Sequence, residues 1–355
     1  MNNNHFAIIM AGGIGARFWP SSTTDYPKQF IDLMGNGNSL LQSTFSRLEK
    51  IIPIENIYIV TQVRYQKFIL DQLGDKLDEE QIIYEPYRRN TAPCILLASL
   101  KIQKQNPDAT IIVSPSDHYI QDEETFKTDM EFGLASAGDQ NLVTFGIIPT
   151  FPATGFGYIS VDQRENRLKT VLEFTEKPDP IKAKSFIDSG NYYWNSGIFV
   201  WSAKAVLNGF KEYATELFDL FSAGINVLNT PDEKKFINDN YPLAKNISID
   251  YALMEKSRLI QLIPARFDWD DLGSWKSMYD LKSKDATNNV VIDAKAYFDH
   301  SSNNLIKAGP NKKIVIAGLS NFIIVDSDDV LLICPIDKDQ EVKSLSEKAR
   351  NKLED

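Results

Sequence analysis

The chain of 355 residues has few of the features on which several protein classes depend. Its two cysteines, Cys94 and Cys334, lie far apart and match neither a disulfide framework nor a zinc-binding pattern. No apolar run is long enough to span a membrane, and no room for a secretory signal precedes the first apolar segment. Acidic residues outnumber basic ones by 48 to 38, so the net charge of -10 repels a polyanion such as DNA. We therefore expect a cytoplasmic protein whose partners are neither nucleic acids nor membranes.

Short β-branched segments alternate with amphipathic ones over the first 150 residues. The strand patterns are residues 6–10, 56–61, 110–114 and 141–147, and the helical patterns are 40–50, 64–73, 93–105 and 123–137. This alternation predicts an α/β fold, Rossmann-like, with a mostly parallel sheet flanked by helices. Ligands of such sheets bind at the carboxyl ends of the strands.

Near residue 287 the pattern changes to short strands and turns. We therefore predict a large α/β domain over residues 1–287 and a small β-rich C-terminal domain over 288–355. The last charged segment, 339–354, predicts a helix whose apolar face carries Val342, Leu345, Ala349 and Leu353. The sequence shows no internal repeat of fixed period.

A glycine-rich loop, "AGGIGARFWP", follows the first predicted strand. Gly12, Gly13 and Gly15 let backbone N–H groups approach an anion, and Arg17 and Lys28 add full positive charges nearby. A triphosphate suits this loop, and a tight turn after a strand is the equally simple alternative.

Two well-known phosphate-binding loops are excluded. A P-loop ends in Gly-Lys-Ser/Thr, which is absent, and the dinucleotide fingerprint requires a third glycine where Phe18 stands. Pro20 and Pro27 also interrupt the helix that a dinucleotide fold needs there. An NAD-dependent oxidoreductase is therefore disfavoured.

Further motifs follow in order, and together they resemble one known family. They are "YPKQF", "EPYRRNTAP", "PSDH", "GFGYI", "FTEKP", "WNSGIF", "SIDYALMEK" and "WDDLGSW". With the glycine loop, the set is similar to that of the mannose-1-phosphate guanylyltransferases, sugar nucleotidyltransferases, over about residues 6–285. The resemblance implies that residues 1–287 form a nucleotidyltransferase domain that uses GTP and mannose-1-phosphate, and a homodimer is compatible with it.

The resemblance implies roles in the reaction for three positively charged residues. It implies that Arg17 and Lys28 contact the triphosphate and that Lys177 holds the sugar phosphate. The attacking group is already an anion, so no activated nucleophile or general base is required. Solvated surface charges remain the alternative for each of these residues alone.

By the same resemblance, Asp117 and Asp271 bind Mg²⁺, which prefers carboxylate oxygens. Asp270 is the neighbour that competes with Asp271 for this role. Strand alternation favours Asp271, which would share a face with Trp269 if the strand continued that far. A turn former or helix cap is the alternative for an aspartate at a strand end.

The resemblance also implies a nucleotide site and a sugar site. Guanine presents two adjacent donors that one carboxylate can accept, and Glu85 is the candidate. An ordinary loop acid, with Asn90 only as a helix cap, is the alternative. The implied nucleotide-binding residues are Ala11, Gly12, Gly13, Gly15, Glu85, Asn90, Thr91 and Ser116. The implied sugar-binding residues are Gly155, Gly157, Glu176 and Asn195.

Two positions depart from the family pattern: Ser116 stands where Ala is expected, and Thr175 stands where Val is usual. Longer relatives carry a C-terminal isomerase barrel, so we expect no isomerase activity here. A nucleotidyltransferase for another base or hexose and a catalytically silent regulatory subunit are the alternative functions. The retained charged residues argue against the silent subunit.

Overall fold

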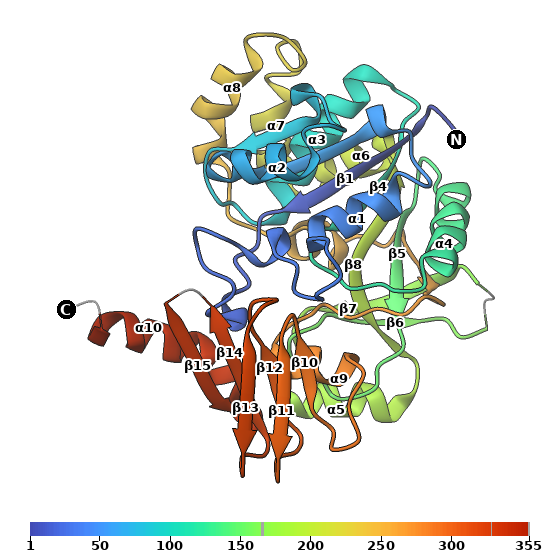
Figure 1. Cartoon of the computed structure of the whole chain (residues 1–355). Coiled ribbons are helices and arrows are strands. Elements are labelled where there is room, and N and C mark those ends of the chain that lie inside the picture. The colour runs from blue at the N-terminus through green and yellow to red at the C-terminus, as the bar shows by residue number, and fades with distance from the viewer. Residues whose placement is uncertain (165–166, 328, 354–355) are drawn as a thin grey trace. The chain divides into compact units, whose positions relative to one another are not determined.

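The computed structural model describes residues 1–164, 167–327 and 329–353 (Figure 1). By compactness the chain divides into two units, each described here by itself. Unit 1 comprises residues 1–12, 44–116 and 120–269, and unit 2 comprises residues 13–43, 117–119 and 270–355. The domain boundary at residue 287 was drawn from sequence pattern and stays a prediction.

Unit 1 is built on a nine-stranded sheet in the described part of the chain, with the order β3-β2-β1-β4-β8-β5-β9-β7-β6. The strands β3, β2, β1 and β4 run parallel to one another. Strand β8 pairs antiparallel with both β4 and β5, so the sheet is mixed beyond β4. The strands are β1 (His5–Ala11), β2 (Ile57–Gln62), β3 (Ile82–Glu85), β4 (Thr110–Pro115), β5 (Leu142–Ile147), β6 (Tyr158–Val161), β7 (Lys169–Thr175), β8 (Tyr192–Ser202) and β9 (Ile260–Pro264).

The helices that accompany this sheet confirm the predicted α/β class. All eight elements predicted in the first 150 residues occur, each within two residues of its expected ends. Helix α3 is buried over most of its length, and it packs with α6 and α7 against Phe6 and Ile8 of β1. The helices are α1 (Leu40–Leu48), α2 (Gln66–Leu73), α3 (Thr91–Gln105), α4 (Glu123–Ser136), α5 (Pro180–Ser189), α6 (Ala203–Tyr213), α7 (Thr215–Ser222) and α8 (Glu233–Asn240).

The carboxyl ends of the parallel strands bring several predicted residues to one edge of the sheet. Ala11 ends β1 opposite Thr61 of β2, and Gln62 of β2 lies opposite Glu85, the last residue of β3. Ser116 follows β4, and its N–H donates to the carbonyl of Met10 at 3.0 Å. This edge is where a sheet of this class binds its ligands.

In unit 2 the chain winds through successive turns of short strands, here called the coil, and ends in a helix. Strands β10 (Val290–Ile292), β12 (Leu305–Lys307) and β14 (Phe322–Ser327) form one parallel row, which β15 (Val330–Pro335) extends antiparallel. Strands β11 (Lys295–Asp299) and β13 (Lys313–Ala317) form a second parallel row. The helices of this unit are α9 (Trp275–Leu281) and α10 (Val342–Leu353).

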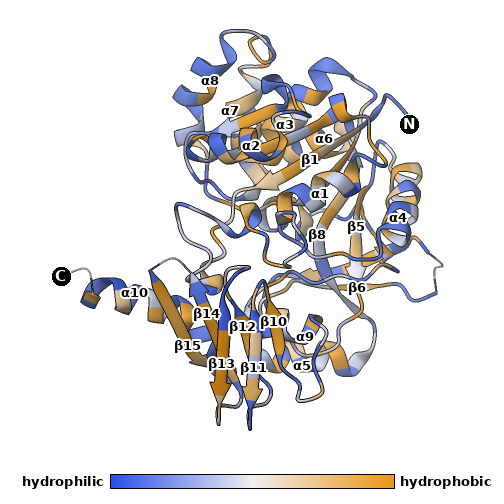
Figure 2. Cartoon of the chain, viewed as in Figure 1, coloured by the Kyte–Doolittle hydropathy of each residue, from blue (hydrophilic) through white to orange (hydrophobic). Residues whose placement is uncertain are grey.

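Successive turns of this coil differ in length, which explains why no fixed repeat is visible in the sequence. Val290 lies opposite Leu305, 15 residues on, and Leu305 lies opposite Ile323, 18 residues on. Inside the coil the buried side chains of Asn289 and Asn304 are hydrogen-bonded to each other, at 3.0 Å. Figure 2 shows hydrophobic colour along much of β13 and β15.

The predicted C-terminal helix exists, and the start of its apolar face is buried. Val342 is fully buried and Leu345 packs against the core of unit 2. Leu353, predicted on the same face, is 83% exposed at the end of the helix. Residue 354 lies outside the described residues.

Candidate active site

The glycine loop continues from β1 into unit 2, where Gly15 lies directly against Lys28. Gly15 has φ of 70°, in the left-handed region that glycine adopts without strain. A Cβ atom at Gly15 would stand 2.3 Å from the Cβ of Lys28, closer than any real contact. The N–H of Lys28 donates to the carbonyl of Ile14 at 3.3 Å. Glycine at position 15 therefore allows the "PKQF" segment to pack onto the loop.

Lys28 connects the segments that carry the two predicted metal ligands. Its Nζ lies 3.1 Å from Oδ2 of Asp117 and donates to the backbone carbonyl of Asp271 at 2.7 Å. The residue is only 4% exposed, and its ammonium lies 5.6 Å from the centre of the Phe18 ring. A lysine that is buried to this extent must be paired. Here its partners belong to Asp117 and Asp271, the two predicted metal ligands.

Arg17 completes the positive charge of this group. It is exposed, lies in a short 3₁₀ turn after Gly15, and donates from Nη1 to the carbonyl of Gly273 at 3.2 Å. Gly273 in turn lies against the carboxylate of Asp271, since a Cβ at Gly273 would be 3.1 Å from both of its oxygens. The structure thus brings together the predicted residues Arg17, Lys28, Asp117 and Asp271 within unit 2.

The two carboxylates titrate differently because of their neighbours. Burial favours a raised pKa for Asp117, but the ammonium of Lys28 and the ring of His118 outweigh it and the pKa is lowered. Burial raises the pKa of Asp271, and the charge of Asp117 adds to this, while Lys28 and Arg17 act against it. Two mutually repelling carboxylates are an environment that a hard cation stabilises.

The sequence argument that separated Asp271 from Asp270 is wrong, because β9 ends at Pro264 and no strand reaches Trp269. The side chain of Asp270 is instead occupied locally: its Oδ1 accepts from the N–H of Leu272 at 2.7 Å. Burial, together with the charge of Asp271, raises the pKa of Asp270 to about 6. The geometry that favours Asp271 is its place beside Lys28 and Arg17.

Residues of unit 1 form the candidate site for the base. Glu85 is 7% exposed, and its Oε1 accepts a hydrogen bond from the hydroxyl of the buried Tyr241. Its Oε2 faces the start of the glycine loop, 3.8 Å from where a Cβ of Gly12 would be. Burial raises the pKa of Glu85 to about 7, against the opposing effects of the Tyr241 hydrogen bond and of Arg88.

The neighbouring predicted residues hold this part of the chain in place. Asn90 has φ of 65°, and its side chain caps α3 by accepting from the N–H of Thr91 at 2.9 Å. The hydroxyl of Thr91 accepts from the N–H of Ile249 at 2.8 Å. Arg89 also donates from Nη2 to the carbonyl of Pro242. The segment of residues 85–92 is thereby tied to the segment of residues 241–249.

Three of the predicted sugar-binding residues, Gly157, Glu176 and Asn195, lie together elsewhere in unit 1. The carboxylate of Glu176 leaves no room for a side chain at Gly157, since Oε2 would be 2.5 Å from its Cβ. The other oxygen of Glu176 pairs with Lys177 at 2.8 Å. Lys177 has φ of 48°, an unusual conformation for a residue with a side chain. Asn195 donates its backbone N–H to the carbonyl of Gly157 at 2.9 Å. Gly155 is exposed, with open space where its Cβ would be.

The same cluster contains an acid that we did not predict, Asp250. It begins a π-helical turn, Asp250–Met254, and its Oδ1 accepts from Nδ2 of Asn195 at 2.9 Å. Burial, and then the nearby charge of Glu176, raises the pKa of Asp250 to about 7. Irregular helical turns of this kind are frequent at functional sites. The motif "SIDYALMEK" contained the residue, but nothing in its spacing distinguished Asp250 from a helix-capping acid.

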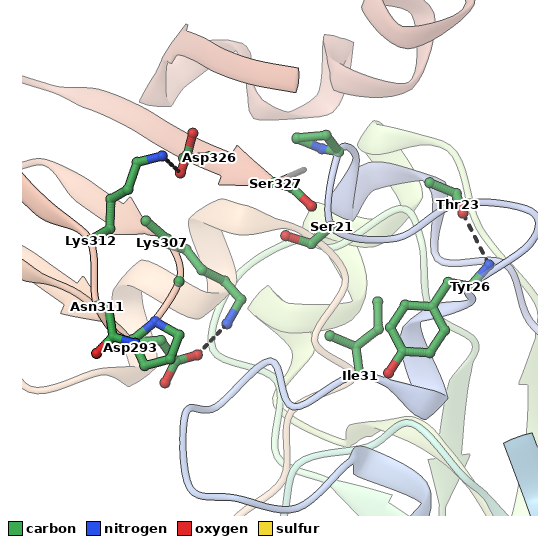
Figure 3. Close-up of a pocket in the computed structure, with 14 residues that line it drawn as sticks. Ser21, Thr23, Tyr26, Ile31, Asp293, Lys307, Asn311, Lys312, Asp326 and Ser327 are labelled. Carbon is green, nitrogen blue, oxygen red and sulfur yellow. Dashed lines mark hydrogen bonds and ion pairs between the residues drawn. The ribbon is translucent and has the colours of Figure 1, made fainter. Parts of the chain in front are cut away.

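A separate cavity of about 750 Å³ lies in unit 2 between the segment of residues 20–31 and the ends of β12 and β14 (Figure 3). Its lysines are already neutralised: Lys307 pairs with Asp293 at 2.8 Å and Lys312 pairs with Asp326 at 2.8 Å. None of the predicted site residues lines it. A cavity with balanced charge does not suit a triphosphate, so we place the candidate active site at the clusters described above.

Comparison with known proteins identifies the family. The Nucleotidyl transferase family matches residues 6–288. A mannose-1-phosphate guanylyltransferase of Salmonella montevideo is 36% identical over 97% of this chain and 73% of its own length. The alginate biosynthesis protein AlgA of Pseudomonas aeruginosa is 32% identical over 95% of this chain and 70% of its own length.

A solved structure from Thermus thermophilus, titled a mannose-1-phosphate geranyltransferase, superimposes with a TM-score of 0.88 at 27% identity. It covers 98% of this chain and 99% of its own.

Nucleotidyltransferases of this family generally use a divalent metal ion. None of the helices in the described residues is both long enough and apolar enough to cross a membrane. The resemblance noted in the sequence is confirmed, and the chain belongs to the nucleotidyl transferase family.

Proposed function

We propose that this protein transfers GMP from GTP to mannose-1-phosphate, releasing pyrophosphate and forming GDP-mannose. The observation that carries the proposal is the buried Lys28, whose ammonium joins the segments of Asp117 and Asp271 beside the glycine loop. Similarity to mannose-1-phosphate guanylyltransferases over nearly the whole chain supports the choice of substrates.

In the proposed reaction a phosphate oxygen of the sugar phosphate attacks the α-phosphorus of GTP. The new P–O bond forms as the bond from the α-phosphorus to the bridging oxygen breaks, and pyrophosphate takes the electron pair. The main obstacle is repulsion between anions, so positive charge is the catalytic requirement. Lys28 and Arg17 serve the triphosphate, and Lys177 serves the sugar phosphate.

Mg²⁺ is the metal that fits these carboxylates, and Asp117 and Asp271 would hold it. Two carboxylates suffice because Mg²⁺ retains waters and takes further oxygens from phosphates. When bound, Mg²⁺ adds positive charge on the phosphate oxygens. Lys28 contacts both segments, through the carboxylate of Asp117 and the backbone carbonyl of Asp271.

We propose separate sets of contacts for the base and for the sugar. Glu85 accepts the two donors of guanine, and the residues Ala11 to Gly13, Gly15, Ser116 and the start of α3 contact the nucleotide. Glu176 and the backbone of Gly155 and Gly157 contact the sugar hydroxyls. Asn195 is also proposed to contact the sugar, together with Asp250, because its amide nitrogen donates to Asp250 and its amide oxygen accepts from Thr144, which fixes both side chains.

The deciding experiment measures pyrophosphate release from the purified protein with four nucleoside triphosphates and several hexose-1-phosphates. GTP with mannose-1-phosphate should give the highest kcat/KM. A higher value for another pair would replace these substrates by that pair, and no turnover with any pair would favour a regulatory subunit. A nucleotidyltransferase domain over residues 1–287, a cytoplasmic location and a homodimer stay predictions.

A further inference from the structure

The buried pair of Glu85 and Tyr241 is the feature that the reaction chemistry leaves unexplained. Glu85 ends β3, and Tyr241 begins a 3₁₀ turn, Tyr241–Leu243, that lies 156 residues later in the chain. The tyrosine is fully buried, with its ring 5.5 Å from that of Phe221. A buried hydroxyl on a fixed ring can donate in only a narrow range of directions, so it fixes the carboxylate that accepts from it.

The direction of this hydrogen bond determines what Glu85 can still accept. Oε1 uses one lone pair for Tyr241 and keeps a second, while Oε2 faces the glycine loop at Gly12. A carboxylate in this state can still accept two donors that lie side by side, one on each oxygen. The pair also resists rotation, because Arg89 ties the 3₁₀ turn to the same loop through the carbonyl of Pro242.

We infer that Tyr241 is a positioning residue that sets the base specificity of the enzyme by orienting the carboxylate of Glu85 toward a purine with two adjacent N–H donors. This inference rests on the proposed role of Glu85 in binding guanine. Tyr241 itself does not touch the base; it acts through Glu85.

The surroundings of Glu85 make this arrangement sensitive to pH. The titratable and charged groups near the pair are Arg88, Arg89 and Cys94, in addition to Tyr241. Burial raises the pKa of Glu85 to about 7, and the hydroxyl of Tyr241 lowers it from an even higher value. Because only the anion accepts both donors, the KM for GTP should rise as the pH falls through about 7. Removal of the hydroxyl should move that rise to higher pH.

The test compares GTP with inosine triphosphate, which has the same phosphates and N1–H but lacks the exocyclic amine. Kinetics are measured at saturating mannose-1-phosphate for the unmodified enzyme, Tyr241→Phe, Glu85→Gln and Tyr58→Phe. Tyr58 is the matched control, because its buried hydroxyl donates to Gln105 at 2.5 Å, away from the proposed site. Taking the ratio of the two nucleotides cancels the titration of their phosphates.

We expect Tyr241→Phe to lower the preference for GTP over inosine triphosphate by about tenfold, with kcat for GTP nearly unchanged. The rise in KM for GTP should shift to higher pH, because the hydrogen bond that lowers the pKa of Glu85 is lost. Glu85→Gln should lose the preference and the pH dependence together, and Tyr58→Phe should keep both.

Failure of the proposed role of Glu85 can be told apart from failure of the inference about Tyr241. If Glu85→Gln keeps the preference for GTP, the proposed role of Glu85 is wrong, and the inference falls with it. If Glu85→Gln loses the preference but Tyr241→Phe keeps both the preference and the pH profile, only the inference about Tyr241 is overturned. Equal losses for both nucleotides in Tyr241→Phe, with a lower Tm, would also overturn it, because they would show a purely structural role.

Discussion

Replacing Lys28 by methionine removes one positive charge while keeping most of the length and packing of the side chain. At 3.1 Å and an effective dielectric constant of about 20, an ammonium and a carboxylate attract each other by about 5 kcal/mol. A phosphate oxygen that approaches the ammonium to a similar distance gains a comparable interaction. Only the part gained in the transition state accelerates the reaction, and preorganised groups of this kind contribute about 3–4 kcal/mol. We therefore expect Lys28→Met to lower kcat by about two to three orders of magnitude.

The control for this variant is Lys307→Met. Lys307 is also a buried lysine of unit 2, paired with Asp293 at 2.8 Å and donating to the carbonyl of Asp32 at 3.1 Å. The carboxylate partners of the two lysines have similar exposed fractions, 32% for Asp117 and 29% for Asp293. Both variants should therefore lose a similar, modest amount of stability, about 1–3 kcal/mol.

The assay is pyrophosphate release at saturating substrates, with thermal unfolding measured on the same preparations. Lys28→Met should be nearly inactive and Lys307→Met nearly normal, at similar Tm. If Lys28→Met turns over within a few-fold of the unmodified enzyme, the catalytic role of this ammonium is refuted. If both variants lose activity equally, the effect is one of stability.

Four further outcomes are expected. Activity should vanish with a chelator and return with Mg²⁺, and Asp271→Asn should raise the Mg²⁺ concentration needed for half-maximal rate; full activity in chelator would contradict the metal site. Gly15→Ala should abolish turnover, because its Cβ would meet Lys28 at 2.3 Å, and a normal kcat would show that the loop can rearrange. Asp250→Asn at pH 8 should raise the KM for mannose-1-phosphate about tenfold and leave the choice of nucleotide unchanged, which steady-state kinetics will test. Burial raises the folded-state pKa of Glu85 from 4.5 to about 7, so the folded protein binds a proton more tightly than the unfolded chain. As the pH rises from 4.5 to 7, the free energy of unfolding should therefore fall by roughly 3 kcal/mol because of Glu85. Denaturant unfolding should detect this fall in the unmodified protein and not in Glu85→Gln.

Hydrophobic periodicity was sufficient to predict the elements of the first 150 residues, because each strand there is a short β-branched run between amphipathic helices. Composition does not show where a strand stops, so the argument that placed Asp271 on a strand face failed at Pro264. The sequence also did not predict that residues 13–43 and 117–119 belong to the same compact unit as residues 270–355. Such grouping depends on contacts between distant parts of the chain.

Among the site residues, those embedded in motifs were predictable, and their partners were not. Glu85 and Asn195 were named from the sequence, whereas Tyr241 and Asp250 emerged only from their hydrogen bonds to these two residues. A tyrosine or an aspartate in a helical segment has many common roles. Its function is defined by the group that it contacts, and sequence spacing of more than 50 residues carries no information about that contact.

The stretch of residues 241–250 has one consequence for how substrates are selected. Its first residue donates to Glu85 and its last accepts from Asn195, so one short piece of backbone supports the proposed base contact and the proposed sugar contact. Insertion or deletion of a single residue within it would displace both contacts at once. A change in the length of this stretch could therefore not alter the nucleotide preference without also disturbing the hexose contact. The two preferences can diverge only through substitutions that change side chains and keep the length of the stretch.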